Sequence, residues 1–82
     1  MEDKPKEILE LERALGIDHV DDYVFEGNHL ISLSIIQQNL IDITPLSKFQ
    51  NLVKLILNAN QISDLSPLNG LSRLNFLDLH SN

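Results

Sequence analysis

The chain has 82 residues, of which 43% are hydrophobic, and it carries a formal net charge of −6 and no cysteine. This length limits it to one domain, and the lack of cysteine excludes disulfide scaffolds, thiolate metal sites and cysteine nucleophiles. The acidic balance, without a basic stripe, argues against a nucleic-acid partner. No segment approaches the length of a membrane span and no secretory signal opens the chain, so we predict no membrane partner and a cytoplasmic location.

The excess negative charge lies in residues 1–29, which hold nine acidic and three basic residues. Within this segment Ile8, Leu11 and Leu15 are spaced three and four residues apart, which places them on one face of a helix. At the start of this helix, Asp3 or Lys4 is expected as the N-cap and Pro5 in the first turn. At its end, Gly16 is expected to stop the helix in a left-handed conformation. The side chains expected on the solvent-facing side are Glu7, Glu10, Glu12 and Arg13.

A strand and a turn are expected after the helix. Tyr23, Val24 and Phe25 alternate as a strand does, with Tyr23 and Phe25 facing the core, and residues 26–29 have the composition of a turn. We interpret residues 1–29 as a helical and hairpin cap that covers the apolar side and the free strand edge of residues 30–82. The alternative interpretation is a helix that docks into a groove on a partner.

Residues 30–82 repeat with a period of 22 residues, and every aligned apolar position is apolar in each copy. The chain therefore divides into the cap (1–29), repeat 1 (30–51), repeat 2 (52–73) and a partial repeat 3 (74–82). All four parts belong to one structural domain, which we expect to be a fragment of a longer repeat. The main aligned sets are Leu30, Leu52 and Leu74; Leu33, Leu55 and Leu77; Ile35, Leu57 and Leu79; and Gln38, Asn60 and Asn82.

The spacing within one copy predicts a short strand and a corner. Leu55 and Leu57 are two residues apart, so they leave a strand on the same face and stack on their counterparts in the neighbouring copies. Asn60 and Asn82 come where the chain leaves the strand, and their amides are expected to form a ladder with unpaired backbone groups. Gln38 stands at this position in repeat 1, where either the longer amide substitutes or the ladder begins imperfectly.

The second half of each copy predicts a brief turn of 3₁₀ type. Thr44 and Ser66 are expected to cap this turn, with a proline at its first position in each case. Asp42 and Asp64 precede the expected caps by two residues, and we interpret them as surface or turn-capping groups rather than a catalytic pair. The residues expected to fill the core from this side are Leu46, Leu68, Phe49 and Leu71.

The pattern of Leu52–Leu71, Leu-x-x-Leu-x-Leu-x-x-Asn-x-Ile-x-Asp-Leu-x-Pro-Leu-x-x-Leu, resembles the leucine-rich-repeat family in its 22-residue internalin-like class. This resemblance implies an α/β solenoid: a right-handed coil with short parallel β-strands on the concave face, short 3₁₀ turns on the convex face and the N-terminal cap at one end. It implies protein binding as the usual activity, with no catalysis and no cofactor. Gln38 and the stop at Asn82, partway through a third copy, depart from the pattern.

The concave face is the expected surface for binding another protein. Ile56 and Phe76 are predicted to form a small apolar patch ringed by polar groups, although single exposed apolar residues on strands are common. The outward strand residues start with Ser32, and the candidate contact residues are Ser34, Ile36, Lys54, Ile56, Asn58, Phe76, Asp78 and His80. Self-association is expected through the uncapped last coil, at Leu74, Leu77 and Leu79.

Two other functions stay open. The chain could be an N-terminal targeting or regulatory domain of a larger enzyme whose catalytic part lies outside it, or an isolated fragment without activity of its own. Metal binding has little support, because the acidic cluster around His19 matches no metal-loop spacing. No serine has the glycine neighbours of a nucleophile elbow, and the three glycines form no phosphate loop.

Overall fold

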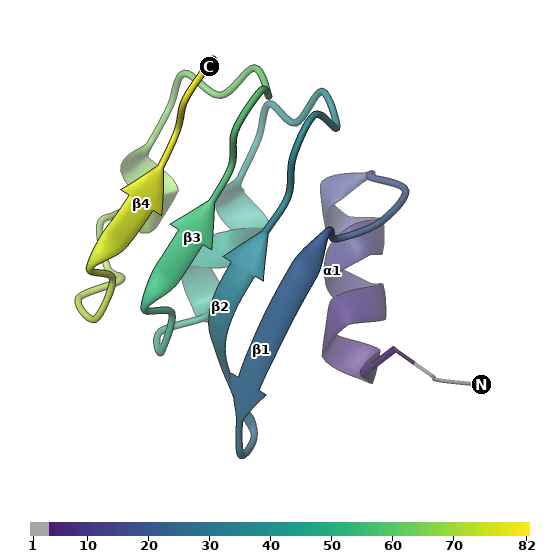
Figure 1. Ribbon diagram of the computed structural model, residues 1–82, viewed down its shortest axis with the longest axis vertical. Helices are drawn as coiled ribbons and strands as arrows, with labels where there is room; N and C mark the ends of the chain where they lie inside the picture. The colour runs from purple at the N-terminus through teal and green to yellow at the C-terminus, as the bar shows by residue number, and fades with distance from the viewer. Residues whose placement is uncertain (1–3) are drawn as a thin grey trace.

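The computed structural model describes residues 4–82. Their four strands form one sheet in the order β1-β2-β3-β4, in which β1 is antiparallel to β2 and the other neighbours are parallel. The helix and two 3₁₀ turns lie on one side of this sheet, and its other face is uncovered (Figure 1). In chain order the elements are α1 (Lys6–Leu15), β1 (Asp22–Glu26), β2 (His29–Ser34), η1 (Thr44–Lys48), β3 (Lys54–Ile56), η2 (Ser66–Leu68) and β4 (Phe76–Asp78).

Helix α1 has the amphipathic pattern and the stop signal predicted for it. Ile8 and Leu11 are buried in the common core and Leu15 packs against it. Gly16 ends the helix with a φ of 70°, a left-handed conformation that glycine adopts without steric cost, and its N–H donates back to the helix. Pro5 is the N-cap residue of the helix rather than part of its first turn, and no side chain caps the helix there, so the expectations for Pro5 and Lys4 are wrong; Asp3 lies outside the described residues.

The predicted hairpin is confirmed and adds β1 to the free edge of β2. Tyr23 and Phe25 both pack against the core, and their rings meet edge to face with centroids 6.1 Å apart. Gly27, with a φ of 62°, lies in the turn between the strands. The turn is tighter than the predicted 26–29, because Glu26 and His29 still pair with each other at the ends of the strands.

The parallel strands pair in the register that the 22-residue period predicts. Leu33 pairs with Leu55 and Leu55 with Leu77, so each strand is one period from its neighbour. Leu33, Leu55 and the neighbouring pair Ile35 and Leu57 are at most 1% exposed and form the centre of the core. The stacking of these apolar rows, inferred from their spacing of two, is therefore confirmed.

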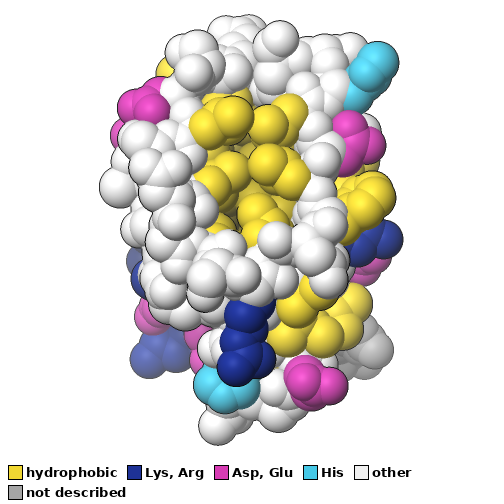
Figure 2. All heavy atoms as spheres, turned by 90° about the vertical axis from the view of Figure 1, so that its left-hand side faces the viewer, with side chains coloured by type: hydrophobic (Ala, Val, Ile, Leu, Met, Phe, Trp, Pro, Cys, Tyr) yellow, Lys and Arg dark blue, Asp and Glu magenta, His cyan; other side chains and the backbone are white. Residues whose placement is uncertain are grey.

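Leu77 continues the same row but is 41% exposed, because β4 is the last strand in the sheet and no further strand of residues 4–82 lies beside it. Leu74 and Leu79 are half-buried and pack against the core from the same end. This side of the molecule carries a hollowed patch of hydrophobic side chains framed by backbone and polar atoms (Figure 2). We name the surface formed by Leu65, Leu68, Leu74, Leu77 and Leu79 the β4 end.

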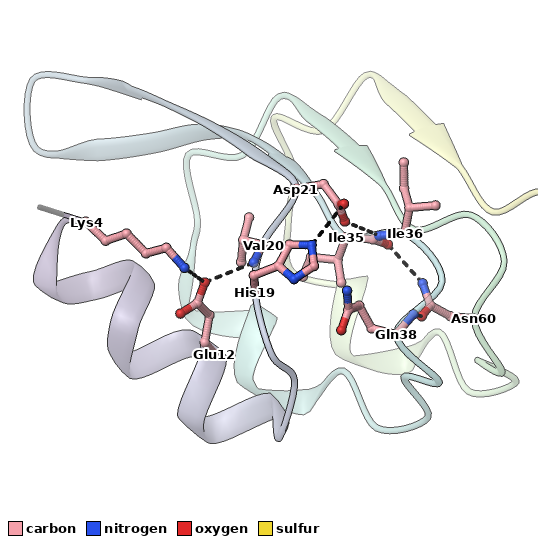
Figure 3. A network of polar contacts seen from close by, with 9 residues as sticks. All are labelled: Lys4, Glu12, His19, Val20, Asp21, Ile35, Ile36, Gln38 and Asn60. Carbon is pink, nitrogen blue, oxygen red and sulfur yellow. Dashed lines mark hydrogen bonds and ion pairs between the residues drawn. The ribbon is translucent and has the colours of Figure 1, made fainter. Parts of the chain in front are cut away.

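The asparagine ladder is present, and of its two rungs Asn60 is buried whereas Asn82 is exposed. The side chain of Asn60 accepts hydrogen bonds from the N–H groups of Gln38 at 2.9 Å and Leu40 at 3.1 Å, and donates to the carbonyl of Ile35 at 2.9 Å (Figure 3). Asn82 repeats this arrangement one period later with Ile62 and Leu57. Gln38 supplies a backbone N–H rather than a side-chain rung, so the ladder starts at Asn60.

The corner after each strand has a backbone signature of the same period. Gln37, Ala59 and Ser81, which are 22 residues apart, have φ values of 57°, 59° and 64°. This left-handed conformation is unfavourable for residues with a Cβ atom and persists only where the surroundings impose it. Asn60 follows Ala59 and Asn82 follows Ser81, and the side-chain hydrogen bonds of these asparagines hold the two corners.

Both 3₁₀ turns form where they were predicted, but the N-cap residues are Ile43 and Leu65, one residue before the predicted caps, and each proline is the second residue of its turn rather than the first. Thr44 and Ser66 are the first residues of the turns and do not cap them. Asp42 Oδ1 accepts hydrogen bonds from the Thr44 N–H at 2.9 Å and hydroxyl at 2.6 Å, and Asp64 Oδ1 accepts from the Ser66 N–H at 2.9 Å. These bonds stabilise the charged forms, so the pKa of each aspartate lies below its ordinary value.

Glu12 contradicts its predicted place on the solvent-facing side of the helix. It is only 7% exposed, and its Oε2 accepts hydrogen bonds from Lys4 Nζ at 2.6 Å and from the Val20 N–H at 2.9 Å (Figure 3). Burial raises the pKa of this carboxyl, but the bonds from Lys4 and Val20 together outweigh burial and leave the pKa below its usual value. Glu12 thus ties α1 to the segment that leads into β1.

The predicted fold class, a right-handed α/β solenoid with concave and convex faces, is wrong. Residues 4–82 form a small compact globule with one mixed four-stranded sheet and one helix, measuring 35 × 27 × 18 Å. Parallel strands advance only about 4.8 Å for each coil, so three of them span about 10 Å, less than any dimension of the molecule. The period correctly predicted how neighbouring strands pair, but the antiparallel hairpin and α1 give the molecule its overall form.

Candidate protein-binding surface

The uncovered side of the sheet gathers the outward residues of all four strands. Because the leucines of each strand point inward, their sequence neighbours point to the opposite face. The strand registers align Val24, Ser32, Lys54 and Phe76 in one row across the sheet. We define the open sheet face as this row together with Ser34, Ile36, Ile56, Asn58, Asp78 and His80, which include all eight candidate contact residues predicted from the sequence.

Phe76 is the largest apolar group of the open sheet face, and it is 47% exposed. Lys54, its direct partner on β3, places its Nζ 5.3 Å from the centroid of the ring. A cation over an aromatic face is attracted by the ring electrons, which holds both side chains in place. Ile56, the other apolar residue of the predicted patch, is half-buried and pairs with Asp78 in the neighbouring row.

The polar groups beside Phe76 are fixed by bonds among themselves. Asp78 accepts a hydrogen bond from Asn58 Nδ2 at 3.3 Å and another from the His80 N–H at 3.1 Å. The amide oxygen of Asn58 is buried and has no hydrogen-bond partner among residues 4–82. A buried acceptor without a donor lowers the stability of the fold. This part of the face is thus ordered and retains one unused acceptor.

Ile36 is another exposed apolar residue of the face and is 36% exposed. Its N–H donates to Asp21 Oδ2 at 2.7 Å, and the Asp21 N–H donates to the carbonyl of Ser34 at 2.8 Å. His19 Nε2 lies 3.4 Å from the other carboxylate oxygen of Asp21 (Figure 3). Asp21 therefore joins the start of the hairpin to the end of β2 and holds the backbone at Ile36.

Val24 is a residue of this face that the sequence analysis did not assign to it. It is 45% exposed and pairs with Ser32 at the β1 margin of the sheet. The signal was present, because a strand with Tyr23 and Phe25 inward must turn Val24 outward. The interpretation of the hairpin as a cap does not include this contribution to the sheet surface.

Two further hollows lie away from the open sheet face. One hollow of about 130 Å³ is lined by polar groups that include His29 and Asn51, whose side chains lie 3.0 Å apart. A second hollow, of about 290 Å³, lies between the capping residues Asp42 and Asp64. Small-molecule sites commonly measure about 300–1,000 Å³. No group of three or more histidine, aspartate or glutamate residues in the described part of the chain could hold a metal ion.

Comparisons with protein-family models, curated proteins and solved structures find no match to this chain. Within residues 4–82, no helix combines the length and apolar character that a membrane crossing requires.

Proposed function

We propose that this chain is a protein-binding module that contacts its partner through the open sheet face. The observation that carries the proposal is the exposure of Phe76, Val24 and Ile36, at 47%, 45% and 36%, on a sheet surface that no other element covers. Aromatic and apolar groups surrounded by polar ones are typical of residues that dominate binding energy at interfaces. The resemblance of the 22-residue pattern to leucine-rich repeats, whose usual activity is protein binding, points the same way.

The contacts around Phe76 suit it for the role of an anchor. Lys54 and Asp78 lie beside it in fixed positions, so little side-chain freedom is left to lose when a partner binds. A partner that fits presents an apolar group for Phe76.

The experiment compares proteins and displayed random peptides retained by the immobilised wild-type chain with those retained by Phe76→Ala. Ile41→Ala is the matched control, because Ile41 is 61% exposed but lies beside the hollow at Asp42 and Asp64 rather than on the sheet face. We expect Phe76→Ala to weaken binding of the retained molecules by tenfold or more, corresponding to about 1.4 kcal/mol or more, and Ile41→Ala to leave it unchanged.

Thermal unfolding of the three proteins shows whether the variants keep their fold. Equal retention of every bound molecule by wild type and by Phe76→Ala would contradict the proposal.

A further inference from the structure

We propose that the partner protein binds through an extended segment that lies along β1 and carries a basic, an apolar and a basic residue at alternate positions. This inference rests on the proposed function, because it names the chemistry of the segment that the sheet binds. We define the acidic margin as Asp22, Val24 and Glu26, the exposed residues of β1. Three features of β1 carry the inference: the exposure of these side chains, their charge and the backbone at the outer edge.

The alternation along β1 fixes where the side chains of the acidic margin lie. Tyr23 and Phe25 pack against the core, so the residues beside them project to the uncovered side of the sheet. Asp22 and Glu26 are exposed, and Val24 is 45% exposed. An apolar group therefore lies between two carboxylates, two residues from each along the strand.

The two carboxylates of the acidic margin have no cationic partner within residues 4–82, because no ion pair there includes Asp22 or Glu26. His29, the cross-strand partner of Glu26, places its Nδ1 3.0 Å from Asn51 Nδ2. Lys54, the one lysine of the open sheet face, lies two strands from β1. A basic segment along β1 thus forms two opposite-charge pairs, whereas an acidic segment is repelled.

The outer edge of β1 supplies backbone groups for an added strand. Ser34 directs its carbonyl toward β1, where it accepts a hydrogen bond at 2.8 Å from the N–H just before the strand. Its partner Asp22 faces it, and alternate residues direct their backbone groups to opposite sides, so those of Tyr23 and Phe25 lie at the outer edge. The alternation continues past the bulge, because the extra residue, Ile31, belongs to β2. An extended peptide can pair with such an edge.

The position of this edge does not depend on the number of repeats. Helix α1 precedes β1 in the chain and packs on the core side of the sheet, so β1 is the last strand on that side among residues 4–82 (Figure 1). Further 22-residue copies would extend the sheet at the β4 end and leave β1 at the opposite margin.

An added strand places its alternate side chains beside the acidic margin. Cross-strand neighbours are about 4.5–5.5 Å apart, so an apolar residue beside Val24 brings basic residues two positions away on either side to Asp22 and Glu26. The pattern is the same in both directions, so it fits parallel and antiparallel addition alike. The rest of the partner then covers the open sheet face toward Phe76.

The first experiment titrates the isotope-labelled 82-residue chain with the peptide Thr-Lys-Thr-Val-Thr-Lys-Thr and follows the backbone amide signals by NMR. We expect saturable binding centred on the amides of β1, with a dissociation constant of about 1 mM or lower, and slower hydrogen exchange at Phe25. Thr-Glu-Thr-Val-Thr-Glu-Thr should bind at least tenfold more weakly. Absence of saturation with the basic peptide, or equal affinity for the two peptides, would overturn the proposal.

The second experiment repeats the titration with Asp22→Asn combined with Glu26→Gln, which keeps the acceptor atom that binds the Tyr23 N–H. Binding of the basic peptide should weaken threefold or more, because both charge pairs are lost. Glu7→Gln combined with Glu10→Gln is the matched control, since it removes the same charge from the exposed side of α1 and should bind as the wild type does. Equal weakening in both double variants would show an effect of net charge alone and refute the acidic margin.

The peptide titration and the retention experiment distinguish the two proposals. Phe76 is three strands from β1, so Phe76→Ala should bind the basic peptide as the wild type does. If the basic peptide does not bind but Phe76→Ala still weakens retention, the chemistry assigned to the partner is wrong and the proposed function stands. If Phe76→Ala retains every bound molecule as the wild type does, the proposed function itself fails.

Discussion

Replacing Asn60 with alanine tests whether the buried amide holds the repeat together. Asn60 is 6% exposed, and three backbone groups depend on its side chain for their bonds: the N–H groups of Gln38 and Leu40 and the carbonyl of Ile35. The carbonyl of Leu57 also accepts from Asn60, but it keeps a bond from Asn82. Two buried groups and one partly buried group therefore lose their partners in Asn60→Ala.

The expected loss of stability scales with these three groups. A buried group left without a partner costs about 1–3 kcal/mol, so we expect Asn60→Ala to lower the free energy of unfolding by about 3 kcal/mol or more. A domain of this size has a total stability of about 4–12 kcal/mol, so the loss is a large fraction of the whole. Asn60→Asp retains the acceptor atoms but removes the donor, and should lose part of this amount.

Urea unfolding followed by circular dichroism measures the loss, and Asn58→Ala is the matched control. Asn58 has the same side chain two residues earlier but only one side-chain hydrogen bond, to Asp78, so its replacement should cost less than about 1 kcal/mol. If the two alanine variants unfold within about 0.5 kcal/mol of each other, the inference that Asn60 holds the corner is refuted.

Two further predictions concern the core and the response to acid. Leu55→Ala should lower the free energy of unfolding in urea by about 2–5 kcal/mol, because Leu55 is 0% exposed. Leu77→Ala should lower it by less than half as much, because Leu77 is 41% exposed. Similar losses in the two variants would show that β4 is covered in solution. Folding lowers the pKa values of three carboxyl groups, those of Asp42, Asp64 and Glu12. Their contribution to the free energy of unfolding is therefore fully present above the ordinary carboxyl pKa of about 4, and it is lost as the pH falls through the lower pKa values of the folded state. Urea titrations at about pH 5 and about pH 2 measure this loss of stability. The double variant Asp42→Asn with Asp64→Asn should lose less stability between the two pH values than the wild type does. An equal loss in both proteins would contradict the capping role.

The features that the sequence predicted correctly are those fixed by a period. Strand pairing between Leu33, Leu55 and Leu77 results from a repeat of 22, because a shift by one residue would turn every leucine out of the core. The hydrogen-bonding role of the Asn60 amide was also predictable from the period, because this position recurs where the chain leaves each parallel strand. The fold class was not determined by the period, because the period does not say how many copies are needed before stacking dominates the shape.

The features that were missed depend on contacts between distant segments. Glu12 lies among charged residues and resembles a solvent-facing side chain, yet it is buried because Lys4 and the Val20 N–H both bind it. Neither partner can be recognised from the local pattern of the helix. The open sheet face was predicted for the repeat strands, but the place of Val24 on it depends on the pairing of β1 with β2.

The left-handed corners at Gln37, Ala59 and Ser81 bear on how the strands of the molecule depend on one another. Ala59 has no local reason to adopt a φ of 59°, and the amide that holds its corner binds backbone groups 20 to 25 residues earlier in the chain. Asn82 in turn requires groups beside Leu57 and Ile62 to be in place. Each corner thus depends on backbone groups of the neighbouring coil, so the left-handed conformation at one strand end is stable only when the strand beside it is in place.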